Sequence, residues 1–151
     1  MDDFLGAPHP NGNTVAYTNC SIDLHYNADY SQGYYNLKFD VKLVMNRDRS
    51  WIDYSKITSP EMLDAILRHE QGHYTLAYFE QQELLRDLEH ARYDDNYKSE
   101  VSSIFDRVHA KYAQLNLDYD DDTTHSLNRK QQTSWDKYFR RRLNGYYLSA
   151  K

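Results

Sequence analysis

The sequence predicts an α+β domain in which antiparallel strands come first and three helices follow. Two observations carry this prediction: apolar and polar residues alternate in the N-terminal third, and apolar residues recur at helical spacing from residue 60 onward. A chain of 151 residues has the length of one ordinary domain. We therefore predict a single domain over residues 1–151, with an irregular lead-in over residues 1–13.

The strand pattern is clearest between Tyr35 and Met45. Every second residue there is apolar and those between are mostly polar or charged, which is typical of a strand with one core face and one solvated face. A shorter alternation over residues 22–26 predicts its partner strand, and the polar segment Asn27–Gly33 predicts the turn between them. The apolar residues that follow are expected to return to the core: Trp51, Ile52 and Tyr54.

A first helix is predicted to begin after Ser59. This serine can cap the free N–H groups, and Pro60 suits the first helical position. Apolar residues then recur at helical spacing, so the helix is expected to run to about Arg92, which is unusually long.

Two further helices are predicted toward the C-terminus. The second carries an apolar stripe over residues 101–115. The polar segment Asp118–Asn128 predicts a loop. The last helix presents apolar residues over 135–143 and is expected to end near Asn144-Gly145, a favourable C-terminal cap.

Charge and composition exclude several classes of function. The net charge of −5 argues against a surface for nucleic acid or an anionic membrane. The one basic run, Arg140–Arg142, is expected to be a solvated helix face. No stretch approaches the roughly 20 apolar residues of a membrane span. The N-terminus lacks the basic and apolar regions of a secretory signal, so the chain is either cytoplasmic or exported with its leader removed. Cys20 is the single cysteine, which excludes an intrachain disulfide and a thiolate zinc cluster.

The pentapeptide His69-Glu70-Gln71-Gly72-His73 is the strongest chemical signal. Residues four apart lie on one helix face, about 6 Å apart along the axis, so the two imidazoles can converge on one Zn²⁺ ion. Glu70 lies beside that face, where it can act as general base toward water activated by the metal. Gly72 is expected to leave room for a neighbouring strand or a substrate. The alternative is an amphipathic helix with two partly buried histidines and no metal.

A third metal ligand must come from elsewhere in the chain. Glu80 lies about 10 Å beyond His73 along the helix axis, which excludes it on a straight helix. The second-helix region offers three candidates, each with an ordinary solvated or capping alternative: Asp94, Glu100 and His109. The segment Tyr119–His125 offers further acidic and histidine side chains.

Several of these residues resemble a known family. Trp51, the pentapeptide after Leu67, and the later pattern Y-D-x-x-T-x-H with a downstream Gln and Trp are similar to the bacterial family called domain of unknown function 922, whose members are predicted zinc proteases of the zincin superfamily. The resemblance covers about Ser50–Trp135, and the matching positions are His69, Glu70, Gln71, His73, Tyr119, Asp120, Thr123, His125, Gln132 and Trp135. Two positions depart from the family pattern: Thr75 stands where Asp is usual, and Ser126 where Gly is frequent.

The resemblance implies a zincin-like fold and hydrolysis of peptide or protein substrates. It makes His125 the expected third zinc ligand, because a neutral imidazole suits zinc. Asp120 or Asp122 would orient a ligating histidine. Tyr119 would donate to an oxyanion, with simple packing as the alternative. The strand over residues 35–45 would line the cleft.

Two other functions compete with peptide hydrolysis. One is a non-catalytic zinc-binding interaction module whose metal is structural. The other is a helical interaction domain in which the pentapeptide has arisen by chance.

Overall fold

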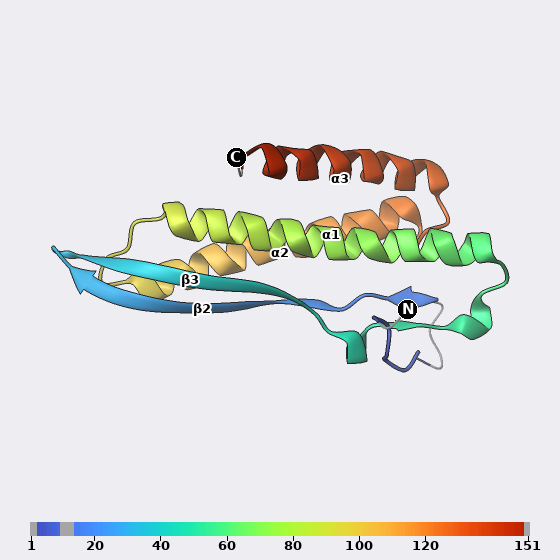
Figure 1. Ribbon diagram of the computed structural model, residues 1–151, viewed down its shortest axis with the longest axis horizontal. Coiled ribbons are helices and arrows are strands. Elements are labelled where there is room, and N and C mark those ends of the chain that lie inside the picture. The colour runs from blue at the N-terminus through green and yellow to red at the C-terminus, as the bar shows by residue number, and fades with distance from the viewer. Residues whose placement is uncertain (1–2, 10–13, 150–151) are drawn as a thin grey trace.

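The computed structural model describes residues 3–9 and 14–149 and confirms the α+β class. Strand pairs come first, and α1 (Pro60–His90), α2 (Tyr97–Thr123) and α3 (Arg129–Ser149) follow. Helix α1 lies between a long β-hairpin and α3, and it packs against α2 along its length (Figure 1). Residues 3–9 are irregular, as predicted for the lead-in, whereas residues 1–2 and 10–13 lie outside the described residues.

The hairpin consists of β2 (Cys20–Ser31) and β3 (Tyr34–Met45), paired antiparallel from Cys20↔Met45 to Ser31↔Tyr34. The predicted core face of β3 is confirmed, because its odd-numbered residues from Tyr35 to Met45 are partly or fully buried, and the even-numbered ones from Asn36 to Lys42 are exposed. The buried face packs on α1.

The predicted turn over Asn27–Gly33 is wrong in extent. Strand β2 continues to Ser31, and the turn contains only Gln32 and Gly33, whose φ angles are 55° and 90°. Two consecutive positive φ angles suit the two-residue hairpin turn that matches strand twist. The polar residues before it are exposed on both faces. The strand ladder and contacts across the hairpin, such as the Asn36–Ser31 hydrogen bond of 2.9 Å, hold them extended without burial. Their composition therefore resembles that of a loop.

A second strand pair lies beside the start of α1. Strand β1 (Ala16–Tyr17) pairs antiparallel with β4 (Trp51–Ile52), between the short 3₁₀ turns Arg47–Arg49 and Tyr54–Lys56. Trp51 and Ile52 are buried as predicted, whereas Tyr54 is 48% exposed and that expectation is wrong. A small apolar cluster ties β1 and β4 to the first turns of α1, and it is built on Ala16, Ile52 and Ile66.

Helix α1 begins as the sequence predicts. The Ser59 hydroxyl accepts a hydrogen bond from the Met62 amide at 3.1 Å, and Pro60 occupies the first helical position. The helix continues without interruption for 31 residues, about 46 Å at the usual rise. Within the described part of the chain, no helix is both long enough and apolar enough to cross a bilayer.

Helices α2 and α3 both extend further than predicted. Residues 118–123 of the predicted loop are the last turns of α2, and only a short turn separates them from α3. Helix α3 likewise continues through Gly145, because the next residue, Tyr146, still packs on Phe79 with ring centroids 5.7 Å apart.

The basic run near the C-terminus is only partly solvated. Arg140 and Arg141 are exposed, as predicted. The Arg142 guanidinium instead lies 4.6 Å from the Phe79 ring and donates hydrogen bonds to the Tyr112 hydroxyl and, at 3.1 Å, to Glu83. This contact joins all three helices, because Glu83 and Phe79 belong to α1 and Tyr112 to α2.

Candidate metal centre

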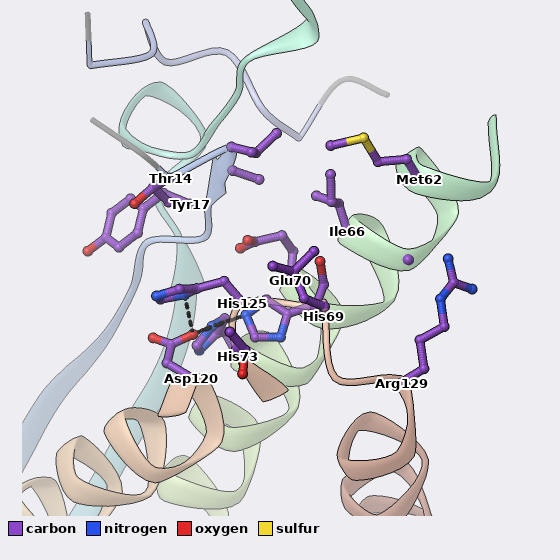
Figure 2. A pocket seen from close by; sticks show the side chains of 16 residues that line it. Thr14, Tyr17, Met62, Ile66, His69, Glu70, His73, Asp120, His125 and Arg129 are labelled. Carbon is purple, nitrogen blue, oxygen red and sulfur yellow. Dashed lines mark hydrogen bonds and ion pairs between the residues drawn. The ribbon is translucent and has the colours of Figure 1, made fainter. Parts of the chain in front are cut away.

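Helices α1 and α2 bring together three side chains of the kinds that can bind a metal (Figure 2). His69 and His73 lie on one face of α1, and their Nε2 atoms are 3.2 Å apart. Asp120, from the last turns of α2, places Oδ1 3.0 Å from the first of these nitrogens and 3.1 Å from the second. His69 is only 3% exposed, so the cluster forms at the bottom of a cavity.

His125 adds a fourth donor from the turn between α2 and α3. Its Nδ1 lies 3.2 Å from Asp120 Oδ1, and its side chain is 63% exposed. The turn is strained, because Thr124, His125 and Ser126 have φ angles of 50°, 49° and 81°, and each left-handed non-glycine residue costs about 1–2 kcal/mol. Strain of this kind concentrates at functional sites.

The protonated nitrogen of His73 is fixed by Asn116. The Asn116 amide group donates from Nδ2 to the Tyr112 carbonyl at 2.9 Å, which leaves its Oδ1 as an acceptor. That oxygen lies 2.8 Å from His73 Nδ1. His73 therefore carries its proton on Nδ1, and its Nε2 faces Asp120 with a bare lone pair.

Thr123 fixes the protonated nitrogen of His69 in the same way. The Thr123 hydroxyl donates to the Tyr119 carbonyl at 2.6 Å, so it acts as acceptor toward His69 Nδ1 at 3.3 Å. His69 thus also presents an unprotonated Nε2. Fixing the tautomer of a histidine through its far nitrogen is typical of metal-ligating imidazoles.

When both imidazoles are neutral in these tautomers, three electron-pair donors face one another. Burial alone would raise the pKa of the Asp120 carboxyl, but hydrogen bonds from His69 and His73, which form when an imidazole carries a proton on Nε2, hold that pKa well below the usual range. Burial would lower the pKa of His73, yet Asp120 and Asn116 raise it above its ordinary value. The cluster therefore attracts positive charge, either as a proton on His73 or as a cation among the donors.

The spacing of the donors fits a tetrahedral ion. Ligands held at about 2.0–2.1 Å in a tetrahedral zinc site lie about 3.3 Å from one another. The three distances among His69, His73 and Asp120 are 3.0–3.2 Å. The atoms of His69, Asp120 and His125 also lie within 4.8 Å of one another. The residues present thus fit a zinc ion without rearrangement of the helices.

Glu70 lies next to the donors and is not one of them. It is 4% exposed. Its Oε2 is buried, with no hydrogen-bond partner among the described residues. Leaving a buried carboxylate oxygen unpaired costs about 1–3 kcal/mol or more. Glu70 is also one of the residues that line the pocket above the donors.

A pocket of about 540 Å³ opens above Glu70 and the donors. Its walls include residues 14–17 from the β1 segment, Ile66 from α1 and Leu127 from the turn before α3 (Figure 2). The expectation that the strand over residues 35–45 lines this cleft is wrong. Strand β3 packs along α1, away from the pocket, because the long hairpin covers the C-terminal half of that helix (Figure 1).

Tyr119 lies beneath the site, not at its surface. It is 0% exposed, and its ring stacks on His69 with centroids 4.7 Å apart. Its hydroxyl donates to the His69 carbonyl at 3.1 Å and accepts from Gln132 Nε2 at 2.8 Å. This position does not support the expected oxyanion contact, because the hydroxyl already binds α1 and α3. Tyr119 instead positions His69.

The absence of a side chain at Gly72 allows Tyr119 of α2 to lie this close to α1. A Cβ atom at residue 72 would lie 2.2 Å from the Tyr119 hydroxyl. The expected free space over this glycine is therefore filled by a side chain of α2, not by a strand or a substrate.

Replacing Gly72 with Ala should therefore displace Tyr119 and destabilise the protein by about 1–3 kcal/mol, the usual cost of overpacking. Denaturant unfolding would measure this change. Gly145→Ala is the matched control, because a Cβ there meets nothing within 4 Å, and helix propensity predicts a gain of up to about 1 kcal/mol. Equal stabilisation of both variants would contradict the packing argument.

The other candidates are placed elsewhere. The Asp122 carboxylate accepts a bond from Trp135 Nε1 at 2.9 Å, so it does not orient a histidine. Glu80 binds His109 at 2.8 Å, away from the donors. Asp94 caps the Asn96 amide at 2.8 Å. Glu100, near the start of α2, also lies outside the donor cluster.

Sequence reasoning missed the roles of three residues of α2. Asp120 was expected to orient a ligand but lies among the donors, and Asn116 and Thr123 hold the two histidines. The signal was their spacing of four and three residues, which places all three on one helix face. The acidic composition of residues 118–123, which is typical of a loop, hides this signal in the sequence.

Comparison with known proteins identifies a family. The model of "Bacterial protein of unknown function (DUF922)" matches residues 3–126, which include β1 to β4, the first two helices and all four donors. Gln132 and Trp135 lie beyond the matched range. No curated protein and no solved structure matches the chain. The chain belongs to the bacterial family DUF922.

Proposed function

We propose that this protein is a zinc-dependent hydrolase of peptide bonds, with His69, His73 and Asp120 as ligands and Glu70 as general base. The observation that carries the proposal is the unpaired Glu70 carboxylate oxygen. The residue Glu70 lines the same pocket as a cluster of donors whose spacing suits zinc.

The division of roles follows from the positions of the side chains. Zinc in such a site supplies Lewis acidity, which polarises a carbonyl group and lowers the pKa of water toward about 7. Glu70 takes the proton of the attacking water and returns it to the leaving amine. Tyr119 and Gly72 hold the His69 turn against α2, and Asn116 and Thr123 keep both Nε2 atoms unprotonated.

Asp120 is the better third ligand, and His125 takes a secondary position. Asp120 Oδ1 lies 3.0–3.1 Å from the Nε2 atoms of both α1 imidazoles, whereas His125 is mostly exposed and meets His69 only through a ring contact of 6.3 Å between centroids. A catalytic zinc keeps one position for water or substrate. Water or a substrate would reach such an ion from the pocket, which the donors and His125 line together.

One observation favours a second function, a zinc-binding module with a structural metal. The four donors His69, His73, Asp120 and His125 are enough to close a tetrahedral shell. A closed site, however, has no need of an unpaired carboxylate beside it. Peptide hydrolysis therefore accounts for Glu70, and a structural metal does not.

The proposal is tested by removing and restoring the metal. The protein is incubated with a quenched-fluorescence peptide library or casein, as purified, after chelation, and after chelation followed by Zn²⁺ or Mg²⁺. We expect cleavage that chelation abolishes and Zn²⁺ restores, whereas Mg²⁺, which prefers oxygen ligands, does not. Zinc-loaded protein with a closed four-ligand shell and no cleavage would favour the structural module.

A further inference from the structure

A second pocket adjoins the candidate metal centre on its other side. Its volume is about 240 Å³, and it shares Tyr17, His73 and Asp120 with the main pocket. From the donor cluster it extends along α1 to Ala77 and Glu80. An extended chain that crosses the donors therefore has one pocket on each side.

The fixed charges of this second pocket are negative. Glu80 lines it and is only 7% exposed. Asp120 adds a second carboxylate, and no Lys or Arg is among the described residues that form the walls. Burial raises the pKa of Glu80, although its bond to His109 opposes the shift. A buried carboxylate of this kind gains most from a cationic partner.

The rest of the lining suits a long basic side chain. Ala77 and Ala113 offer small apolar surfaces along which a methylene chain can lie. Thr18 also lines the pocket, and its Oγ1 is buried without a hydrogen-bond partner in the described part of the chain. A hydroxyl oxygen of this kind has the capacity to accept a hydrogen bond from an ammonium or guanidinium group.

We infer that this pocket binds a lysine or arginine side chain of a peptide, with Glu80 as the specificity-determining residue. The shared residues His73 and Asp120 place the pocket directly beside the donors. The basic residue is thus adjacent to the scissile bond, a conclusion that rests on the proposed function. Side-chain binding itself does not require cleavage.

Binding is tested by ¹⁵N NMR titration of the zinc-loaded protein with Nα-acetyl-lysine methylamide, whose side-chain ammonium group is free. The neutral analogue Nα-acetyl-norleucine methylamide is titrated in parallel. A charged hydrogen bond predicts roughly 10- to 100-fold tighter binding of the lysine compound. The amide shifts should concentrate at Cys20, Ala77 and Ala113. Glu80→Gln should reduce lysine affinity to that of norleucine while zinc content and the circular dichroism spectrum stay unchanged.

Glu89→Gln is the matched control, because it makes the same charge change on an exposed position of α1 outside both pockets. It should leave lysine binding within about twofold of the parent. Equal binding of the two compounds, or a lysine preference that survives Glu80→Gln, would overturn the inference.

A cleavage assay separates this inference from the proposed function. Peptides that carry Lys, norleucine or Glu on either side of the scissile bond are compared. Cleavage without preference for Lys or Arg would overturn the basic subsite and leave the peptidase standing. Glu80-dependent lysine binding without cleavage of any peptide would support the subsite and contradict the peptidase.

Discussion

Glu70→Gln is expected to lower kcat/KM for peptide hydrolysis by about 10²- to 10⁴-fold, the usual contribution of a general acid–base group. The amide has the shape of the carboxylate but cannot accept a proton from water. Because Glu70 Oε2 has no hydrogen-bond partner among the described residues, the substitution removes no hydrogen bond of this oxygen and should not impair folding. Initial rates on a cleaved library peptide, normalised to zinc content, would measure the effect.

The control for this prediction is Glu61→Gln in the first turn of α1, an exposed position outside the main pocket. It should retain activity within about twofold. Zinc content of Glu70→Gln should equal that of the parent, since Glu70 is not a ligand. Full activity of Glu70→Gln on any peptide would show that another group accepts the proton.

His73→Ala and Asp120→Ala are each expected to abolish stoichiometric zinc binding. Each substitution removes one of the three donors that lie 3.0–3.2 Å apart. The remaining two would be completed only by the mostly exposed His125, and a catalytic zinc site needs three well-placed protein ligands. Competition with a chromogenic chelator would give the dissociation constants. Asn116→Ala removes only the partner of a ligand, so it should weaken binding by about 10- to 100-fold.

His125→Ala separates the two possible third ligands. If Asp120 is the permanent ligand, this variant should retain stoichiometric zinc with weakened affinity, and Asp120→Ala should lose it. If His125→Ala lost zinc and Asp120→Ala retained it, His125 would be the ligand and Asp120 would have an orienting role. His25→Ala, an exposed histidine on β2 outside the site, serves as control and should bind zinc as the parent does.

The elements that could be predicted were those in which one face is buried. Strand β3 and the buried stripes of α1 and α2 have apolar residues at a fixed period, because packing against a core imposes it. The ends of β2 and α2 were missed because their residues are largely solvated. Asp118, Asp121 and Asp122 are exposed on a helix. The run of three consecutive aspartates at residues 120–122 is typical of a loop when the sequence is considered locally. The buried Tyr119 and Thr123 on either side of this run were the contrary signal.

The candidate site was predictable only where it is local in sequence. The positions of His69, Glu70 and His73 follow from helix geometry alone, and the structure places them as that geometry requires. Asp120 belongs to the cluster because α2 crosses α1 at Gly72, where the absence of a Cβ lets Tyr119 approach. The periodicity of each helix in a single sequence does not show at which residues two helices cross. The roles of Asp120, Asn116 and Tyr119 therefore required the structure.

Anomalous diffraction at the zinc absorption edge, on crystals grown without chelator, tests the central claim most directly. We predict one zinc ion per chain, bound by His69 Nε2, His73 Nε2 and Asp120 Oδ1, with Glu70 close by and not coordinated. The same donors around a bridging proton or water, with no anomalous peak after incubation with zinc, would contradict it. So would a zinc ion bound at any other group of residues.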